Sequence, residues 1–185
     1  MEANPQLNAT LQEMIDHYEI RKMLSVYCHG CDRGDERRMA SVYGKDSWDD
    51  HGRYKGPGRA YAEWAMKAFA TKGSKSTHLL GQSLINVNGD RAGVETCFLA
   101  TLSAKNENGE DVVTLLSGRY VDTVIREGVE WKIDKRICVR DWSITLDVKK
   151  DFLSNYDYVQ GVMSDQDPSY AILGLTHPSV PVDVT

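Results

Sequence analysis

Residues 77–143 read THLLGQSLINVNGDRAGVETCFLATLSAKNENGEDVVTLLSGRYVDTVIREGVEWKIDKRICVRDWS. Three short polar segments interrupt this stretch, at Asn88–Asp90, Glu107–Glu110 and Glu127–Glu130. Two of them contain the dipeptide Asn-Gly, which strongly favours a tight hairpin turn between antiparallel strands. The stretch therefore predicts an antiparallel sheet of consecutive hairpins, and this sheet decides the fold.

The residues before this sheet predict helices. From Leu11 to Cys31 the apolar residues recur at spacings of three and four, the period of an amphipathic helix, and Gly34 is a natural residue for its C-terminal end. A short helix, a strand, a turn and a second amphipathic helix follow, at 36–43, 47–54, 55–58 and 59–71. Helices followed by hairpins predict an α+β fold in a single domain, with the N-terminal helices packed on one face of the sheet.

The composition excludes several classes of function. The chain of 185 residues has 27 acidic and 22 basic side chains, a formal net charge of −5. A negative chain without a basic cluster does not favour nucleic acid, whose phosphates attract lysine and arginine. No apolar run approaches the roughly 20 residues of a membrane-spanning helix. The first ten residues are polar and lack the pattern of a signal peptide, so we expect a cytoplasmic protein.

The four cysteines do not predict a metal or redox centre, although Cys28 and Cys31 form a C-x-x-C motif. A zinc site would need a second pair at comparable spacing, and a thioredoxin-like motif would open a helix just after a strand. Because the motif falls late in a helical pattern, we expect the cysteines to pack as small hydrophobic residues. The sequence predicts no cofactor and no metal.

The order of the elements, together with several short motifs, resembles the SnoaL-like family, a branch of the NTF2-like fold. The motifs are Gly-x-Tyr-x-Asp at 118–122, Trp-x-Ile at 131–133, the helix ending YCHGCDRGD at 27–35, and Thr77-His78 and Asn88-Gly89-Asp90 at the two ends of one strand. The resemblance spans residues 15–143. It implies a cone in which a curved antiparallel sheet and the N-terminal helices enclose a deep pocket.

Within this fold the chain most resembles the cofactor-free lyases, which include scytalone dehydratase, bacterial bile acid 7α-dehydratase and hexachlorocyclohexane dehydrochlorinase. These enzymes pair an Asp at the end of the first helix with a His that opens the next long strand, and the matching residues here are Asp32 and His78. The bile acid dehydratase is also similar at two further positions, Tyr27 and Arg140. The resemblance implies that these four residues are catalytic.

These side chains suit an elimination. Histidine titrates near neutral pH, so His78 is the expected base, and the Asp32 carboxylate would orient the imidazole and stabilise its protonated form. Tyr27 would donate to the leaving or carbonyl oxygen, and Arg140 would hold developing negative charge. Each residue also has a purely structural interpretation: a turn cap for Asp32, a hydrogen-bonded strand residue for His78, helix packing for Tyr27, and a surface ion pair of Arg140 with Asp141 or another carboxylate.

A second polar cluster, Trp48-Asp49-Asp50-His51-Gly52, lies on the first predicted strand. Alternation places Asp49 and His51 on one face of that strand and Trp48 and Asp50 on the other, so one set should approach the pocket. His51 is then an additional acid or a substrate contact; otherwise the cluster is a solvated strand end. The spacing of the cluster specifies no further metal ligands.

Aromatic residues predict the lining of the pocket. Alternation places Trp142 on the same strand face as Arg140 and Cys138. Together with Trp64 and Tyr120, it indicates a pocket for a cyclic or aryl compound, although the same rings could simply form core. The residues predicted to contact substrate are His51, Asp49, Trp142, Tyr120 and Trp64.

The function that these features favour is a cofactor-independent lyase acting on a hydrophobic cyclic or aromatic compound, by dehydratase-type elimination or by formaldehyde-releasing carbon–carbon cleavage. One alternative is an isomerase related to ketosteroid isomerase, whose oxyanion pair does not map onto this chain. Another is a non-catalytic ligand-binding module or the small subunit of a ring-hydroxylating dioxygenase, which has no need of the Asp–His pair.

The C-terminal extension, residues 145–185, carries aromatic residues at positions 152, 156, 158 and 170. We expect it to cover the mouth of the pocket or a subunit interface, with loose terminal residues. Relatives with this arrangement are often trimers or dimers, so we expect a homo-oligomer, a trimer in preference to a dimer. The sequence does not identify the substrate.

Overall fold

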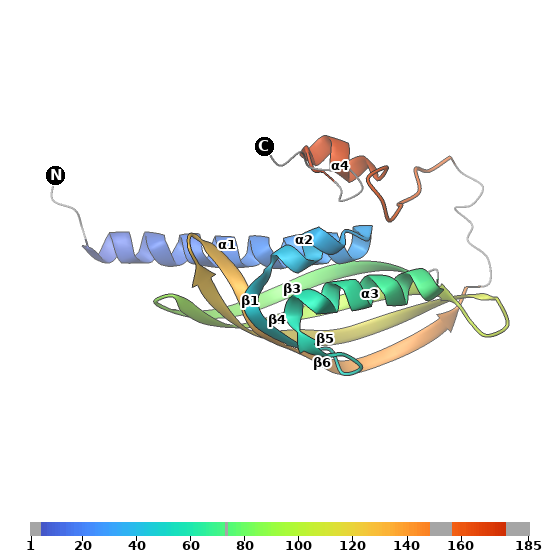
Figure 1. Ribbon diagram of the computed structural model, residues 1–185, viewed down its shortest axis with the longest axis horizontal. Helices are drawn as coiled ribbons and strands as arrows, with labels where there is room; N and C mark the ends of the chain where they lie inside the picture. The colour runs from blue at the N-terminus through green and yellow to red at the C-terminus, as the bar shows by residue number, and fades with distance from the viewer. Residues whose placement is uncertain (1–4, 73, 149–156, 177–185) are drawn as a thin grey trace.

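The computed structural model describes residues 5–72, 74–148 and 157–176 (Figure 1). In chain order its elements are α1 (Pro5–Arg33), α2 (Glu36–Ser41), β1 (Tyr43–Asp50), β2 (Lys55–Pro57), α3 (Gly58–Lys72), β3 (Lys75–Asn88), β4 (Arg91–Lys105), β5 (Asp111–Glu127), β6 (Glu130–Asp147) and α4 (Pro168–Leu173). The long strands follow the helices, which confirms the predicted α+β architecture. None of the helices in the described ranges has the length and apolar character needed to span a membrane.

One six-stranded sheet organises the fold, in the order β2-β1-β6-β5-β4-β3. Strands β3 to β6 form the predicted hairpins, and positive φ angles of 60°, 80° and 64° at Gly89, Gly109 and Gly128 permit their turns. The antiparallel pairing predicted for residues 77–143 is confirmed, and β1 joins this sheet parallel to β6, with Tyr43 opposite Ile133. The sheet is therefore mixed and open, with β2 and β3 at its two edges.

The first strand ends earlier than the sequence pattern indicated. β1 stops at Asp50, whose carboxylate accepts a hydrogen bond from the backbone N–H of Gly52 at 2.9 Å. Gly52 adopts a positive φ of 74°, so the chain turns at this point and leads into β2. This turn places His51 just beyond the strand. α2 is also shorter than predicted and ends at Ser41.

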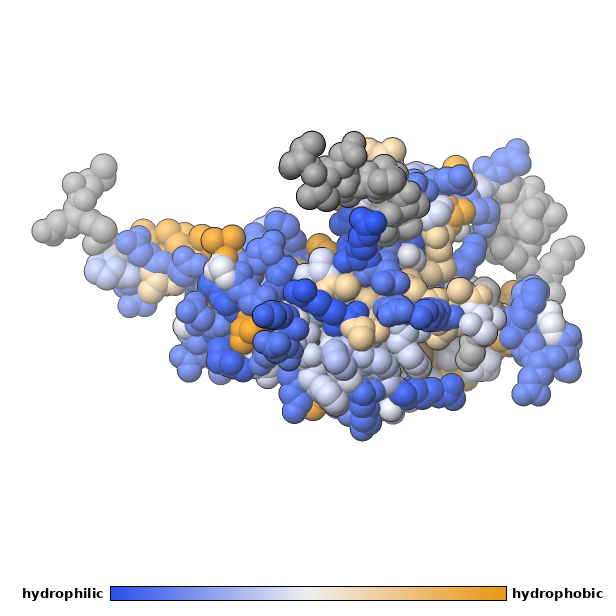
Figure 2. All heavy atoms as spheres, viewed as in Figure 1, coloured by the Kyte–Doolittle hydropathy of each residue, from blue (hydrophilic) through white to orange (hydrophobic). Residues whose placement is uncertain are grey.

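Helices α1 and α3 cover one face of the sheet, here called the inner face, and the hydrophobic core lies between them and the strands (Figure 1). Alternate residues of β4 point to this face and are buried. Only the second half of α1 takes part, because its buried residues begin at Asp16. The first half projects beyond the sheet and exposes an apolar stripe (Figure 2), made of Leu7, Leu11, Met14, Ile15 and Tyr18.

The segment 157–176 lies against the C-terminal end of α1 (Figure 1). The Tyr170 hydroxyl donates to the Asp35 carboxylate at 3.0 Å, and Lys75 Nζ donates to the backbone carbonyl of Gly161 at 3.1 Å. These contacts attach the segment both to the helix end and to the edge strand β3. It is therefore held next to the residues that follow α1.

The C-terminal extension begins later than residue 145, because β6 continues to Asp147. Phe152 and Tyr156, two of the aromatic residues assigned to the extension, lie outside the described residues. Tyr158 is exposed, whereas Tyr170 is 2% exposed. Only Tyr170 of the described aromatic residues thus anchors the extension to the domain by burial.

Candidate active site

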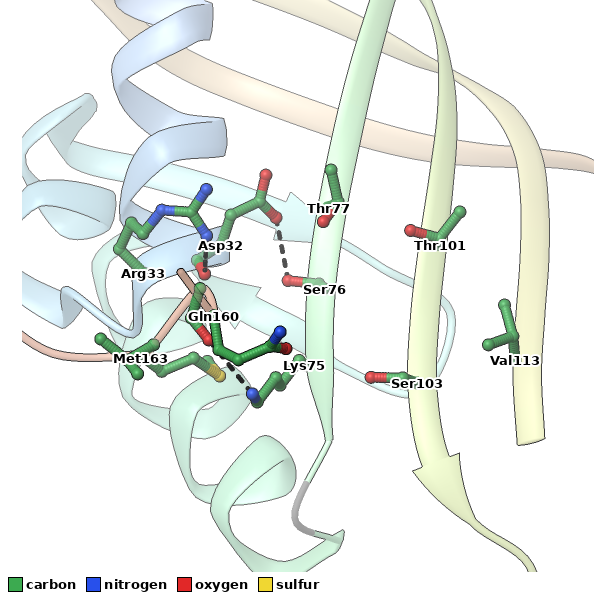
Figure 3. Close-up of a pocket in the computed structure, with 12 residues that line it drawn as sticks. Asp32, Arg33, Lys75, Ser76, Thr77, Thr101, Ser103, Val113, Gln160 and Met163 are labelled. Atoms are coloured by element: carbon green, nitrogen blue, oxygen red, sulfur yellow. Dashed lines mark hydrogen bonds between the residues drawn. The ribbon is translucent and has the colours of Figure 1, made fainter. Parts of the chain in front are cut away.

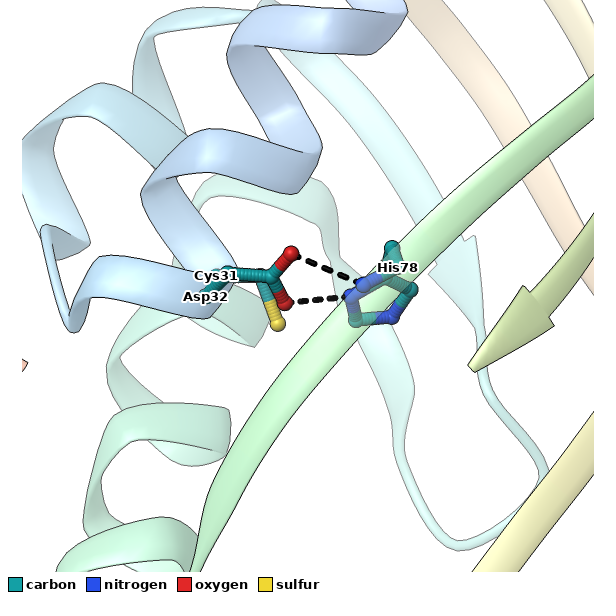
Figure 4. A group of neighbouring side chains, drawn as sticks. All are labelled: Cys31, Asp32 and His78. Carbon is teal, nitrogen blue, oxygen red and sulfur yellow. Dashed lines mark hydrogen bonds and ion pairs between the residues drawn. The ribbon is translucent and has the colours of Figure 1, made fainter. Parts of the chain in front are cut away.

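Asp32 and His78 are brought together by the end of α1 and the start of the edge strand β3 (Figure 4). His78 Nδ1 lies 2.6 Å from Asp32 Oδ1, and the backbone N–H of His78 donates to Asp32 Oδ2 at 2.8 Å. The Ser76 hydroxyl also donates to Asp32 Oδ1, at 2.9 Å. The side chains are 9% and 10% exposed. We refer to Asp32 and His78 as the first pair.

The electrostatics of the first pair keep the carboxylate ionised. Burial opposes the charge, but the hydrogen bonds from His78 and Ser76 outweigh it and lower the pKa of Asp32. An ionised carboxylate only accepts hydrogen bonds, so the proton of a neutral His78 resides on Nδ1. The other ring nitrogen, Nε2, points away from Asp32 (Figure 4).

Cys31 lies beside the first pair, and its Sγ falls within 4.8 Å of the Asp32 and His78 ligand atoms (Figure 4). That spacing suits a metal ion, but a metal would need the thiolate. Burial raises the pKa of the Cys31 thiol, and its sulfur lies 3.8 Å from the Ser76 hydroxyl. Cys28 is also a free thiol in the hydrophobic core. In this structure the carboxylate oxygens of Asp32 are engaged by hydrogen bonds from His78 and Ser76.

A cavity of about 260 Å³ lies next to Asp32 (Figure 3). It is bounded by the end of α1, by β3, β4 and β5, and by residues 160–163 of the C-terminal segment. Its polar lining includes Arg33, Lys75, Ser76 and Thr101. Asp32 of the first pair therefore borders a space that the C-terminal segment partly covers, whereas His78 is not among the residues that line it.

Asp49 and His51 form a second pair, within the β1–β2 hairpin. His51 Nδ1 is in direct hydrogen-bond contact with Asp49 Oδ1. The Tyr43 hydroxyl donates to Asp49 Oδ2 at 2.5 Å, and the Tyr27 hydroxyl lies 3.4 Å from His51 Nε2. Asp49 is completely buried, and the His51 side chain is 12% exposed. Tyr27 therefore contacts the second pair.

The surroundings of the second pair favour the uncharged forms of His51 and Tyr27. Burial lowers the pKa of His51, and the positive charge of Arg136 lowers it further, against the opposing effect of Asp49. Burial raises the pKa of Tyr27 well above its ordinary value. His51 is therefore neutral at pH 7, with Nδ1 protonated and Nε2 as an acceptor, and the Tyr27 hydroxyl remains a hydrogen-bond donor.

Arg136 is a buried residue that the sequence analysis missed. Its Nε and Nη2 donate to the two oxygens of Asp122 at 2.8 and 2.7 Å, and both side chains have no exposed surface. Its guanidinium carbon lies 4.3 Å from the ring centroid of Tyr27 and 4.1 Å from that of Tyr120. Simple alternation from the buried Ile133 would have turned Arg136 outward, but the register of β6 shifts between these residues. The signal available in the sequence was Asp122, which alternates with Tyr120 and needs a cation when buried.

Arg140 and Trp142 lie on opposite faces of β6, so the prediction that they share a face is wrong. Gly118 pairs with Arg140 and Ser117 pairs with Trp142, which leaves one extra residue in β6 between them. This bulge reverses the alternation. Arg140 belongs to the inner face and is exposed, whereas Trp142 is on the outer face and is 52% exposed.

Of the ion pairs considered for Arg140, the one with Asp141 does not form. Asp141 instead pairs with Arg119, whose Nη2 lies 3.2 Å from Asp141 Oδ1. Among the described residues, no hydrogen bond or ion pair is seen for Arg140. Its guanidinium is therefore available at the open end of the inner face.

Aromatic rings connect the two pairs. Phe98 lies 6.4 Å from the His78 ring and stacks on Tyr120 at 4.4 Å, and Tyr120 lies 6.1 Å from the His51 ring. Tyr61 stacks on His51 at 4.0 Å. Trp64 packs on Tyr61 at 5.9 Å and is 39% exposed, at the outer end of this series. Tyr120 and Trp64 thus both join the aromatic layer around the second pair.

Comparisons with known proteins bear on this site. A family model described as a SnoaL-like domain matches residues 12–137, and no curated protein matches the chain. Among solved structures, a protein from Novosphingobium aromaticivorans described as a scytalone dehydratase has a TM-score of 0.64 at 20% identity, covering 77% of this chain and 93% of that one. A hexachlorocyclohexane dehydrochlorinase from Novosphingobium barchaimii has a TM-score of 0.65 at 17% identity, covering 82% and 99%.

The fold is also similar to that of the β subunit of an aromatic-ring-hydroxylating dioxygenase from Novosphingobium aromaticivorans. The TM-score is 0.55 at 17% identity, over 70% of this chain and 92% of that one. At these identities the likeness concerns the fold, which hosts several functions. The family model, in contrast, matches more than half of the sequence. The chain therefore belongs to the family of SnoaL-like domains.

Proposed function

We propose that this protein is a cofactor-independent lyase that acts on a hydrophobic cyclic or aromatic small molecule. The observation that carries the proposal is the 2.6 Å contact between His78 and Asp32, a carboxylate that lines a cavity. A carboxylate that orients an imidazole is the arrangement that general acid–base catalysis needs. The fold is compatible with this activity but does not require it.

In the proposed reaction His78 Nε2 removes a proton from a carbon next to an activating group. The electron pair left on that carbon expels the leaving group, which takes the proton from the His78 imidazolium. Asp32 stays ionised throughout, holds Nδ1 of the ring and stabilises the imidazolium. The same sequence serves loss of water, and a related one serves cleavage of a carbon–carbon bond that releases formaldehyde.

The other predicted residues keep roles that fit their positions. Tyr27 has a protonated hydroxyl on the inner face and is proposed to donate to a substrate oxygen. Arg140 has an available guanidinium on the same face and is proposed to hold developing negative charge. Asp49, His51, Tyr120 and Trp64 are proposed to line the substrate site. Trp142 is left out of this proposal because it lies on the outer face.

The test is turnover without added cofactor or metal, against a panel of hydroxylated aryl and alicyclic compounds. The variants are His78→Ala and Asp32→Asn, and the matched control is His17→Ala, a histidine substitution on the remote part of α1. We expect product formation by wild type and control, and a collapse in both site variants with the fold intact by circular dichroism. Turnover that survives both site substitutions would refute the role of the pair.

A second candidate function is suggested by the likeness to a dioxygenase β subunit: a non-catalytic subunit or ligand-binding module. Tight ligand binding without turnover by any form would favour it. A ketosteroid-isomerase-like activity would instead yield a rearranged product of unchanged mass. Mass spectrometry of the same reactions separates these outcomes.

We also propose that the protein is a homo-oligomer, with three subunits preferred over two. The outer face of the sheet exposes a group of large apolar residues, namely Leu79, Leu99, Trp142, Ile144 and Leu146. Exposed apolar surfaces of this kind commonly mark protein–protein contacts. Light scattering coupled to size-exclusion chromatography measures the mass directly, and a monomer at micromolar concentration would refute the proposal.

A further inference from the structure

The interior around the second pair contains an unused hydrogen-bond donor. Arg136 has no exposed surface, and its Nε and Nη2 are both occupied by Asp122. Among the described residues, Nη1 of Arg136 is a buried nitrogen with no hydrogen-bond partner. Leaving a charged donor unsatisfied in the interior is costly, so such a group in a folded protein calls for an explanation.

Two further polar atoms lie in the same neighbourhood. Tyr27 packs edge-on against Tyr120, and both rings flank the Arg136 guanidinium at 4.3 and 4.1 Å. The Tyr27 hydroxyl is also the group that reaches His51, at 3.4 Å from Nε2. That distance is long for a hydrogen bond, so an oxygen atom that approaches His51 Nε2 competes with a weak contact.

On the inner face of β6, exposure to solvent increases along the strand from Arg136 to Arg140. Three residues of β6 lie on this inner face. Arg136 is opposite Asp122 of β5, Cys138 is opposite Tyr120, and Arg140 is opposite Gly118. Burial raises the pKa of the Cys138 thiol to about 12, while the charges of Arg136 and Arg140 act against that rise. The half-buried Cys138 therefore lies between the buried guanidinium of Arg136 and the exposed one of Arg140.

We propose that Arg136 Nη1, His51 Nε2 and the Tyr27 hydroxyl form a binding site for an ionisable oxygen of the ligand, a phenol or an enol. The ligand O–H bond breaks, its proton moves to His51 Nε2, and the electron pair stays on the oxygen as an anion. The anion accepts hydrogen bonds from Arg136 and Tyr27. Asp49 stabilises the resulting imidazolium, and the Tyr43 hydroxyl holds Asp49 in place.

This inference deepens the proposed function, on which it rests for the claim that the ligand is a substrate. It narrows the substrate class from cyclic or aromatic compounds to those that carry a weakly acidic hydroxyl group. It also assigns charge stabilisation to Arg136, which is fixed by a bidentate carboxylate, in addition to the exposed Arg140. The binding step itself does not depend on His78, so it is tested separately from turnover.

The probe is 4-nitrophenol, whose anion is yellow and whose acid form is colourless, at a pH below its solution pKa. We expect wild-type protein to generate the absorption of the anion with saturation, and 4-nitroanisole, which has no acidic hydrogen, to bind more weakly. Arg136→Lys retains a cation opposite Asp122 but loses the planar fork, so we expect affinity for the anion to fall about 10- to 100-fold. His51→Gln removes the proton acceptor and should abolish the anion absorption.

The matched control is Arg126→Lys. Arg126 is also an arginine that pairs with a carboxylate, Asp16 at 2.6 Å, and packs on an aromatic ring, Trp131 at 4.4 Å, but it lies elsewhere in the fold. It should bind the probe like wild type. If Arg136→Lys does not fold, as judged by circular dichroism, His51→Gln decides the matter alone.

Two results would overturn the inference: no anion absorption with saturating wild-type protein, or equal absorption in wild type and His51→Gln. Turnover of a substrate without an acidic hydroxyl would count against the substrate class and leave the lyase proposal intact. Anion binding without any turnover would leave the site in place and remove the lyase proposal. The failures of the two proposals are therefore distinguishable.

Discussion

The molecule contains two His–Asp pairs that share a hydrogen-bond pattern and differ in their surroundings. In each, Nδ1 of the histidine faces a carboxylate oxygen. Asp32 and His78 lie 46 residues apart, and Asp32 lines a cavity, whereas Asp49 and His51 lie two residues apart and are packed under aromatic rings. The same two side chains thus occupy an environment that reaches a cavity in one case and an environment closed by a stacked ring in the other.

The largest difference should appear in turnover. We expect Asp32→Asn to lower kcat about 10²- to 10⁴-fold, because the amide no longer fixes the His78 tautomer or stabilises its charge. Asp49→Asn should lower kcat far less and should mainly raise KM, because the second pair is proposed to bind rather than to transfer the proton of the reacting carbon. Steady-state kinetics of both variants measure this difference in kcat. Equal losses of kcat would contradict the separate roles proposed for the two pairs.

The second pair differs from the first in having a buried arginine beside it. Arg136→Met leaves the Asp122 carboxylate without its cation in the interior, so we expect a loss of about 3–5 kcal/mol in the free energy of unfolding. Arg126→Met, at a partly exposed ion pair, should cost about 1–2 kcal/mol. Urea denaturation gives both values. Similar values for the two variants would show that the Arg136 pair is not as isolated from water as its burial indicates.

The two pairs should lose stability in different pH ranges. The pKa of His51 is lowered on folding, so the unfolded chain binds more protons and stability falls as pH drops below about 6.5, by at most about 1.4 kcal/mol per pH unit for one histidine. The lowered pKa of Asp32 places its loss of stability below about pH 4 instead. Unfolding midpoints between pH 8 and 3 therefore test the comparison.

His51→Gln should flatten only the upper part of this profile, and Asp32→Asn only the lower part. His29 needs its own control, His29→Gln, because burial and nearby arginines lower its pKa as well. A profile in which His51→Gln leaves the upper range unchanged would contradict a neutral, buried His51.

The smallest effect is expected at the link between Tyr27 and the second pair. The contact of 3.4 Å is long, so Tyr27→Phe should cost less than about 1 kcal/mol in unfolding free energy. It should raise KM a few-fold for substrates with an acidic hydroxyl and leave other compounds unaffected. A large loss of kcat for every substrate would instead place Tyr27 at the reacting atoms, beside the first pair.

Local pattern in the sequence determined the kinds of elements and their order. Hairpin turns at Asn-Gly and the spacing of apolar residues before them indicated helices followed by long strands, because turn geometry and burial on one face depend on neighbouring residues. The Asp49–His51 pair was also within reach of the sequence, since residues two apart on a strand share a face. Asp32 and His78 were paired only by resemblance to a family, because nothing local connects residues so far apart.

Tertiary structure alone decided what depended on register and strand order. The parallel pairing of β1 with β6 follows from where the meander returns, which no local spacing encodes. The register shift before Arg136 turned that side chain inward, and the bulge opposite Ser117 and Gly118 sent Trp142 to the outer face. Side chains of a strand alternate between the two faces of the sheet with a period of two. A single extra residue therefore moves every side chain beyond it to the opposite face. The position of that residue becomes known only from the pairing of the strands.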